Sequence, residues 1–248
     1  MTLSSFFTNH PRAALGLSGG VDSAYLLYAA RQARAQVQPY FVNTAFQPRF
    51  ELADAQRLCE QLGVELRVVD VDIFQYPAVT ANPAQRCYHC KRAIFTALAE
   101  RARADGYTLL LDGTNASDES DERPGMRALR ELSVRSPLRE CALDKARIRA
   151  LSRQAGLFMW DKPAYACLAT RIPTGEAITP DKLHITERAE QALFALGLRD
   201  FRVRYYHGAA RIQLPQAQLA AAISLREEIL AALKPDYAAV FLDLEVRT

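Results

Sequence analysis

The sequence predicts an α/β protein, with a larger domain built on a parallel sheet and a smaller α+β domain after it. Short apolar segments alternate with helical patterns as far as residue 111. The segment 107–111 is almost entirely apolar, as expected of a strand that is covered on both faces. After residue 179 the order becomes helix, strand, strand, helix, strand. Strands that alternate with helices form parallel sheets with right-handed crossovers.

The elements of the first domain follow in order. We expect strands at 13–17, 37–42, 65–71 and 107–111, and helices after Ser23 and at 50–62, 88–104 and 144–155. Apolar residues recur every three or four positions in the helical segments, so each helix can bury one face. Gly63 directly follows the helix at 50–62, where a glycine ends a helix in the left-handed conformation.

The second domain follows a loop at 160–179 that contains two prolines. We expect a helix at 180–196, strands at 201–206 and 210–214, a helix at 216–233 and a strand at 239–244. His207 and Gly208 fit a tight turn, which would make its two flanking strands antiparallel. We therefore divide the chain into residues 1–165 and 166–248.

The composition is that of an ordinary globular chain: 248 residues, 50% hydrophobic and 24% charged. A net charge of +3 is too small to indicate nucleic-acid binding by itself. No apolar run approaches the ~20 residues that span a bilayer. The N-terminal segment lacks a signal-peptide pattern, so we expect a cytoplasmic protein with no membrane partner. Five cysteines in a reducing compartment need an explanation other than disulfides.

Residues 18–23, Ser-Gly-Gly-Val-Asp-Ser, are the most informative segment. They follow the first strand and open a helix, where unpaired backbone N–H groups and the helix dipole bind anions. Gly19 and Gly20 let the backbone approach phosphate oxygens, and Ser18 and Ser23 add hydroxyl donors. The segment matches neither the Walker loop nor the dinucleotide-binding glycine pattern. The alternative is a glycine-rich turn that binds nothing.

This segment resembles the loop of the PP-loop ATP pyrophosphatases, whose nucleotide domain is Rossmann-like. The resemblance implies that residues 1–165 bind ATP, cleave it between the α and β phosphates and adenylate a substrate oxygen. The loop would hold pyrophosphate, and Asp22 would act in catalysis by helping to place Mg²⁺. Asp112, Gly113 and Thr114 should lie beside the nucleotide, because open α/β sheets bind ligands at the carboxyl ends of their strands.

Three of the five cysteines lie in chemically suggestive surroundings. Cys87 and Cys90 form a Cys-x-x-Cys pair at the start of a helix, and Cys167 stands near Arg171. Helix N-termini and nearby cations favour the thiolate form of cysteine. Cys59 lies on the apolar face of its helix and Cys141 has no partner nearby in the sequence, so we interpret both as structural.

Further motifs follow in order: Arg-Cys-Tyr-His-Cys-Lys (86–91), Asp-Gly-Thr-Asn-x-x-Asp (112–118), Arg-Pro-Gly (123–125), Cys-Leu-Ala-Thr-Arg-Ile-Pro (167–173), Phe-Arg-Val-Arg (201–204), Ala-Arg-Ile (210–212) and Leu-Asp-Leu (242–244). With the loop, they resemble the LarE family of ATP-dependent sulfur transferases over nearly the whole chain. The resemblance implies a role in building the nickel-pincer nucleotide cofactor, with pyridinium-3,5-biscarboxylic acid mononucleotide as substrate. ATP would adenylate each carboxylate, and a sulfur nucleophile would displace AMP to leave a thiocarboxylate.

The sequence leaves the source of the sulfur open. Cys87, Cys90 and Cys167 resemble the family branch in which three thiolates hold a [4Fe–4S] cluster and the fourth iron carries an exchangeable sulfide. In other members one cysteine gives up its own sulfur, which here would be Cys167, although that cysteine lies one place earlier, at the position of Ala166. Zinc bound with His89 is the third alternative.

Four arginines are candidates for binding the anionic substrate: Arg171, Arg202, Arg204 and Arg211. Their planar guanidinium groups pair with carboxylates and phosphates in bidentate fashion. Arg202 and Arg204 share one face of a strand, and the resemblance makes Arg202 the phosphate ligand. The alternative is a solvated basic edge strand.

The resemblance further implies a homo-oligomer, a trimer of dimers that makes a hexamer. Glu190 and Gln213 are further candidates, for subunit or metal contacts. Residues 166–248 would then serve substrate binding and oligomerisation. One rival interpretation is a tRNA thiolase of the same superfamily, with the basic stretch 123–153 as its RNA footprint. The chain shows no zinc-ribbon cysteine set, which argues against a nucleic-acid partner. The others are an amide-forming synthetase and a regulator that binds ATP without cleaving it.

Overall fold

A computed structural model describes residues 1–118 and 124–247 of the chain. The chain divides into two compact units. The first comprises Met1–Val79 and Gln85–Tyr165, and the second comprises Thr80–Ala84 and Ala166–Thr248. The segment Thr80–Ala84 therefore lies within the sequence range of the first unit but belongs to the second.

The sequence did not predict that Thr80–Ala84 belongs with the second unit. Backbone and side-chain hydrogen bonds hold it there. The side-chain amide of Asn82 donates to the Pro173 carbonyl (2.7 Å), and the Asn82 carbonyl accepts from the Gly175 N–H (2.8 Å). The Ile178 N–H also donates to the Thr80 carbonyl (2.8 Å). A short loop segment with no apolar periodicity gives no sequence signal for such pairing.

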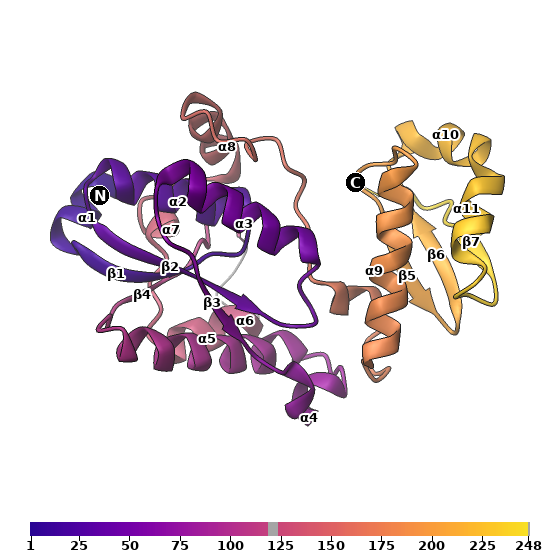
Figure 1. Cartoon of the computed structure of the whole chain (residues 1–248), viewed down its shortest axis with the longest axis horizontal. Helices are drawn as coiled ribbons and strands as arrows, with labels where there is room; N and C mark the ends of the chain where they lie inside the picture. Colours follow the sequence, from indigo (N-terminus) through magenta and orange to yellow (C-terminus); the bar gives the residue numbers. More distant parts are fainter. Residues whose placement is uncertain (119–123, 248) are drawn as a thin grey trace. The chain divides into compact units, whose positions relative to one another are not determined.

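The first unit contains a four-stranded parallel sheet in the order β3-β2-β1-β4, which confirms the predicted α/β class. The strands are β1 (Arg12–Gly16), β2 (Gln36–Asn43), β3 (Arg67–Asp70) and β4 (Leu110–Leu111). Helices α2 (Val21–Gln32) and α3 (Arg49–Leu62) cover one face, and α5 (Arg86–Ala104) and α6 (Pro124–Glu131) cover the other (Figure 1). Both faces of β1 are buried, which explains its nearly continuous apolar sequence.

Several features at the ends of these elements follow from local chemistry. Gly63 ends α3 in the left-handed conformation (φ 61°), as predicted. Asp144 caps α8 (Lys145–Gln154), where its side chain accepts from the Arg147 N–H at 2.7 Å. Helix α1 (Leu3–Asn9) was not predicted, although a capping box between Thr2 and Ser5 marks its start. The short helices α4 (Pro77–Thr80), α6 and α7 (Pro137–Glu140) were not predicted either.

The second unit has the predicted mixed sheet, in the order β5-β6-β7. β5 (Arg202–Tyr206) and β6 (Ala209–Gln213) are antiparallel, and β6 pairs in parallel with β7 (Val240–Leu242). His207 (φ 48°) and Gly208 (φ 81°) form the tight turn, with the positive φ at both positions that a twisted hairpin favours. Helix α9 (Pro180–Ala195) contacts β5.

The single helix expected at 216–233 is wrong. The chain instead forms the 3-10 turn η3 (Gln216–Gln218), α10 (Leu219–Ser224) and α11 (Arg226–Leu233). Leu225 separates the two α-helices with a non-helical ψ of 19° and packs against the core of this unit. The apolar period continues through the break, so periodicity alone did not reveal it.

No helix in the described ranges has both the length and the apolar character needed to cross a bilayer.

A buried ion pair organises the second unit. Arg171, at the end of the 3-10 turn η2 (Leu168–Arg171), donates from Nε and Nη2 to the two carboxylate oxygens of Glu190 in α9, at 2.9 and 3.1 Å. The exposed fractions of the two side chains are 0% and 2%. Glu190 Oε1 also accepts the N–H of Val203 in β5 (3.0 Å). One carboxylate therefore joins η2, α9 and β5.

We predict that Glu190→Ala destabilises the second unit strongly, because it leaves the Arg171 charge buried without its counter-ion. Loss of one partner of a buried pair costs about 3–5 kcal/mol of unfolding free energy, whereas replacing both partners with apolar residues costs far less. Urea unfolding followed by circular dichroism should rank the variants as E190A below R171M/E190L. Equal stability of E190A and the unsubstituted chain would contradict this role.

A second charged network joins β2 to the end of α5. The Tyr40 hydroxyl donates to Asp105 Oδ2 (2.7 Å), Arg101 Nε donates to the same oxygen (3.0 Å), and Arg67 makes a close ion pair with it. The Tyr40 hydrogen bond, with the two arginines, lowers the pKa of Asp105 from 3.8 to about 2. Asp105 therefore stabilises the fold most when it is ionised.

We predict that this contribution is present above about pH 4 and is lost as the pH falls through 3.8 towards 2, because the folded state then has to take up a proton at an unfavourable site. Asp105→Asn should be less stable than the unsubstituted chain at pH 7, and the difference should shrink at pH 2–3. Urea unfolding across that range measures it. A difference that does not change with pH would contradict the assignment.

Candidate active site

The phosphate loop predicted from the sequence connects β1 to α2. β1 ends at Gly16, α2 begins at Val21, and Gly20 is the N-cap residue in an extended conformation (φ −98°, ψ 162°). Within the described part of the chain no side chain caps this helix end, so its first N–H groups can bind another acceptor. Together with the helix dipole they suit an anion.

The two serines of the loop have different surroundings. Ser23 is 2% exposed and its hydroxyl closes the loop from within: Oγ accepts the Ser18 N–H (3.2 Å) and donates to the Gly20 carbonyl (3.3 Å). Ser18 is exposed, and its hydroxyl lies 3.1 Å from that of Ser23. Ser23 therefore shapes the loop, while Ser18 faces the space in front of it.

Two glycines allow three segments to meet at this loop. Gly19 has φ +72°, and a Cβ built on it would lie 2.5 Å from the backbone oxygen of Glu51 in α3. A Cβ on Gly113, just after β4, would lie 2.8 Å from the backbone nitrogen of Ser23. Both positions were predicted as nucleotide-binding, and both need glycine because other backbone passes so close.

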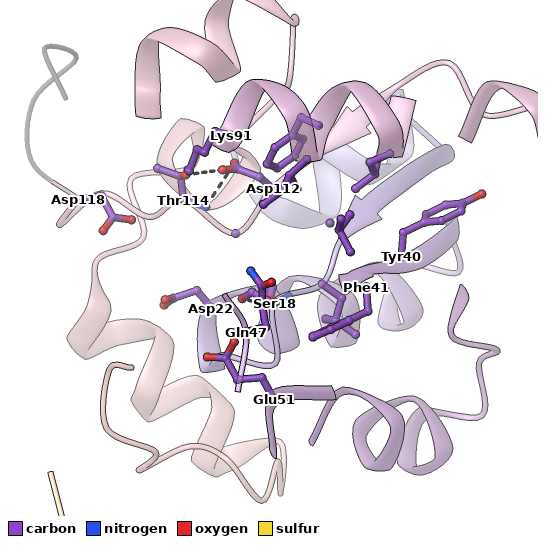
Figure 2. Close-up of a pocket in the computed structure, with 18 residues that line it drawn as sticks. Ser18, Asp22, Tyr40, Phe41, Gln47, Glu51, Lys91, Asp112, Thr114 and Asp118 are labelled. Atoms are coloured by element: carbon purple, nitrogen blue, oxygen red, sulfur yellow. Dashed lines mark hydrogen bonds between the residues drawn. The ribbon is translucent and has the colours of Figure 1, made fainter. Parts of the chain in front are cut away.

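A cavity of about 310 Å³ opens in front of the loop, near the lower limit of ligand pockets at roughly 300 Å³. In Figure 2, Ser18 and Asp22 lie across the cavity from Asp112 and Thr114, while Tyr40 and Phe41 lie at the end away from Asp118. The polar lining residues are Ser18, Asp22, Ser23, Gln47, Glu51, Lys91, Asp112, Thr114 and Asp118. The apolar lining comes from Leu17, Tyr40, Phe41, Val42, Ile94, Phe95 and Leu98. The cavity therefore has a charged end and an apolar end.

Asp22, in the first turn of α2, is the charged residue of the segment 18–23. Its Oδ2 accepts from Lys145 Nζ at 2.5 Å, whereas its Oδ1 is buried and has no hydrogen-bond partner among the described residues. Burial raises the pKa of Asp22, the Lys145 ammonium opposes that shift, and the Asp118 carboxylate adds to it. A buried carboxylate oxygen without a partner, beside an anion-binding loop, fits a hard cation such as Mg²⁺.

The turn after β4 is held by the Asp112 carboxylate. Asp112 is 5% exposed and accepts from Thr114 Oγ1 (2.5 Å), Thr114 N–H (3.3 Å) and Ser136 Oγ (2.6 Å). Asp118 accepts the Asn115 N–H (2.9 Å). Asp112 and Thr114 line the cavity. Their hydrogen bonds to each other also hold the turn in place. Asp118 is followed in the sequence by three more acidic residues, Glu119, Asp121 and Glu122, which lie outside the described residues.

The three predicted metal-binding cysteines are divided between the two units. Cys87 is exposed and Cys90 half-buried on the first turn of α5, and residues three apart on a helix lie on one face. Cys167 is the N-cap residue of η2 in the second unit. In residues 1–118 and 124–247, no three His, Cys, Asp or Glu side chains gather as a metal site. Cys59, interpreted as structural, is 2% exposed, and burial raises its pKa to about 12.

Three of the four predicted substrate arginines, Arg202, Arg204 and Arg211, lie on one face of the small sheet. Arg204 pairs in register with Arg211, and Arg202 with Gln213. Arg204 donates to the Thr170 carbonyl (2.9 Å), and Arg211 donates to Asp243 Oδ2 (2.7 Å). Burial lowers the pKa of Arg204, as do the charges of the neighbouring arginines. Arg202 is 5% exposed and Arg204 half-buried, which differs from the solvated edge strand considered as the alternative.

Arg171 stands apart from the other three. Its guanidinium is fully buried against Glu190 and also donates to the carbonyls of Ala166 (2.7 Å) and Cys167 (3.3 Å). In this conformation it fixes the backbone around Cys167. Glu190, considered for a subunit or metal contact, is the partner that holds it there.

Sequence reasoning missed the basic residues that surround the phosphate loop. Lys145 reaches Asp22 from α8, and Lys162 donates to the Gly19 carbonyl (2.8 Å) from the segment that leads out of the first unit. Both are more than 120 residues from the loop in sequence. The chain has 31 Lys and Arg residues, and the sequence does not indicate which residue any one of them contacts. Only the fold identifies the partners of Lys145 and Lys162.

Comparison with known proteins agrees with this site. The model of the family described as queuosine biosynthesis protein QueC matches residues 12–89, which contain the phosphate loop. A tRNA-specific 2-thiouridylase MnmA of Thermotoga petrophila is 28% identical over 147 residues, which cover 48% of this chain and 40% of that protein.

Two relatives match along most of their length. An uncharacterised protein of Synechocystis is 39% identical over 98% of this chain and 92% of its own. The pyridinium-3,5-bisthiocarboxylic acid mononucleotide synthase of Lactiplantibacillus plantarum is 31% identical over 88% of this chain and 80% of its own. With that identity and coverage, and with a PP-loop site of the geometry described above, the chain belongs to the LarE family of ATP-dependent sulfur transferases.

Proposed function

We propose that this protein converts pyridinium-3,5-biscarboxylic acid mononucleotide to its thiocarboxylate form, as a step of nickel-pincer nucleotide biosynthesis. The observation that carries the proposal is the open phosphate loop beside the buried, unpartnered Asp22 oxygen, in a chain whose named relative is a synthase of the bisthiocarboxylic product.

The residues of the first unit suit adenylation of a carboxylate. The loop N–H groups at Gly19 and Gly20 would bind the β and γ phosphates, and the apolar end of the cavity would take the adenosine. Asp22 would hold Mg²⁺, which supplies charge neutralisation of the phosphates when bound. A substrate carboxylate oxygen then attacks the α phosphorus, and the bond from that phosphorus to the oxygen bridging to the β phosphorus breaks. Pyrophosphate leaves with the bonding electron pair.

The second half of the reaction exchanges oxygen for sulfur. A sulfur nucleophile attacks the activated carboxyl carbon, and AMP leaves with the carboxylate oxygen. The substrate carries a phosphate and two carboxylates, which fits the face defined by Arg202, Arg204 and Arg211. Because burial and neighbouring cations lower the pKa of Arg204, an anion bound there would relieve repulsion among the arginines.

The cysteines are proposed as the sulfur site. Cys87 and Cys90 share one turn of α5 and would hold a [4Fe–4S] cluster together with Cys167 of the second unit. Such a cluster, with three thiolate ligands, would supply an exchangeable sulfide at its fourth iron. The alternative is that Cys167 gives up its own sulfur. A homo-oligomer, up to a hexamer, also remains a proposal.

A tRNA thiolase is the second candidate, favoured by the similarity to MnmA. That similarity covers less than half of either chain. Filter binding of unmodified tRNA at 50 and 200 mM salt distinguishes the two, because a true RNA footprint loses affinity steeply with salt.

The proposed function is tested by measuring pyrophosphate and AMP released from ATP with and without the dicarboxylate mononucleotide, and by mass spectrometry of the product. We predict release that depends on this substrate and a product in which oxygen is replaced by sulfur. Asp22→Asn should lower kcat/KM by about 100-fold or more, since it removes the carboxylate charge that would hold Mg²⁺ against the phosphates. Asp161→Asn, at an exposed position, is the matched control. Equal release of pyrophosphate and AMP with and without the substrate would contradict the proposal.

The sulfur source has its own test. Protein purified anaerobically should contain iron and absorb near ~400 nm as cluster proteins do, and Cys87→Ala should lose both while Cys141→Ala keeps them. The protein mass should be the same before and after turnover. Iron-free protein after reconstitution would contradict the cluster, and the loss of one H₂S per chain from Cys167 during turnover would instead support sacrifice of that cysteine.

A further inference from the structure

Lys162 contacts the phosphate loop through a backbone carbonyl oxygen. Its Nζ donates to the Gly19 carbonyl oxygen at 2.8 Å and to Asp54 Oδ2 of α3 at 2.5 Å. It also lies 5.0 Å from the centre of the Phe50 ring. The side chain is 18% exposed, so these contacts form in a largely enclosed space.

The carbonyl that Lys162 holds belongs to the peptide between Gly19 and Gly20. In a trans peptide the C=O and the N–H point in opposite directions. Fixing the Gly19 oxygen towards Lys162 therefore fixes the Gly20 N–H in the opposite direction. Gly20 caps α2, where an anion would bind.

This peptide needs an external restraint. Two consecutive glycines have the widest choice of backbone angles, and Gly19 already adopts φ +72°. An unrestrained Gly–Gly peptide would lose more conformational entropy when it binds an anion. A charge-assisted hydrogen bond to its carbonyl removes part of that cost in advance.

Lys162 is itself held in place. Arg149 of α8 donates to the Trp160 carbonyl (3.0 Å) and to the Lys162 carbonyl (2.7 Å). The same helix carries Lys145, which pairs with Asp22. Helix α8 thus supports both lysines that contact the loop region.

The charge of Lys162 is matched by Asp54. The pair therefore adds little net charge to the site, and the contact acts through the direction of the Gly19–Gly20 peptide.

We propose that Lys162 is a positioning residue that holds the phosphate loop in the conformation which binds the pyrophosphate part of ATP. The inference rests on the proposed function for its ligand, but it concerns a residue and a contact that this function does not require.

The test measures binding of ATP and of inorganic pyrophosphate by calorimetry, without turnover. We expect Lys162→Met to raise both dissociation constants about tenfold or more, as loss of a hydrogen bond from a charged donor would. Lys234→Met is the matched control, because Lys234 also donates to a backbone carbonyl, that of Ala238 (2.9 Å), in the second unit. It should bind as the unsubstituted chain does.

A double variant separates position from charge. In K162M the Asp54 carboxylate loses its counter-ion and could repel phosphate by itself, whereas K162M/D54N has no such charge. We expect the double variant to bind as weakly as K162M. It leaves no unpaired charge, so it is also the variant to use if K162M does not fold, as judged by circular dichroism.

Steady-state kinetics adds a readout that a merely structural role would not change. The KM for ATP should rise about as much as the dissociation constants, while kcat at saturating ATP changes less than about threefold, since the contact is the same in ground and transition states. Unchanged binding in K162M, or normal binding in K162M/D54N, would overturn this inference but not the proposed function. Failure of the unsubstituted chain to bind ATP and pyrophosphate would overturn the proposed function and this inference with it.

Discussion

The candidate site depends on the hydrogen bonds of the Ser23 hydroxyl. This hydroxyl accepts the Ser18 N–H and donates to the Gly20 carbonyl, so it closes the loop from inside while the N–H groups of the helix end stay open. Gly113 packs directly on the Ser23 backbone, which brings the end of β4 to the loop. Ser18, Asp22, Asp112 and Gly113 all line the cavity beside this closed loop.

Several residues of the basic stretch 123–153 have specific partners in the folded chain. As a run of positive charge in the sequence, the stretch suggested a footprint for RNA. Three of its described members have partners within the first unit: Lys145 pairs with Asp22, Arg149 donates to the backbone carbonyls of residues 160 and 162, and Arg135 pairs with Glu140. Part of the positive charge is therefore used to organise the nucleotide site.

The sequence was sufficient for several features that depend on local chemistry. The strand–loop–helix order placed residues 18–23 at the end of β1, and the position of Gly63 marked the end of α3. It was insufficient wherever a residue acts through a distant partner. Lys162 is more than 100 residues from both Gly19 and Asp54, and Arg171 pairs with Glu190 in another element. An arginine that balances a buried carboxylate and one that faces a ligand look the same in a sequence.

The short segment Thr80–Ala84 makes the division of the chain less simple than a boundary after Tyr165. The polypeptide passes between the units three times, after Val79, after Ala84 and after Tyr165. Asn82 is fully buried in the second unit. A single cut at 165 would therefore yield neither unit whole, because the first fragment would retain a segment whose hydrogen-bond partners lie on the other. Neither unit can therefore be obtained whole as one continuous piece of the sequence.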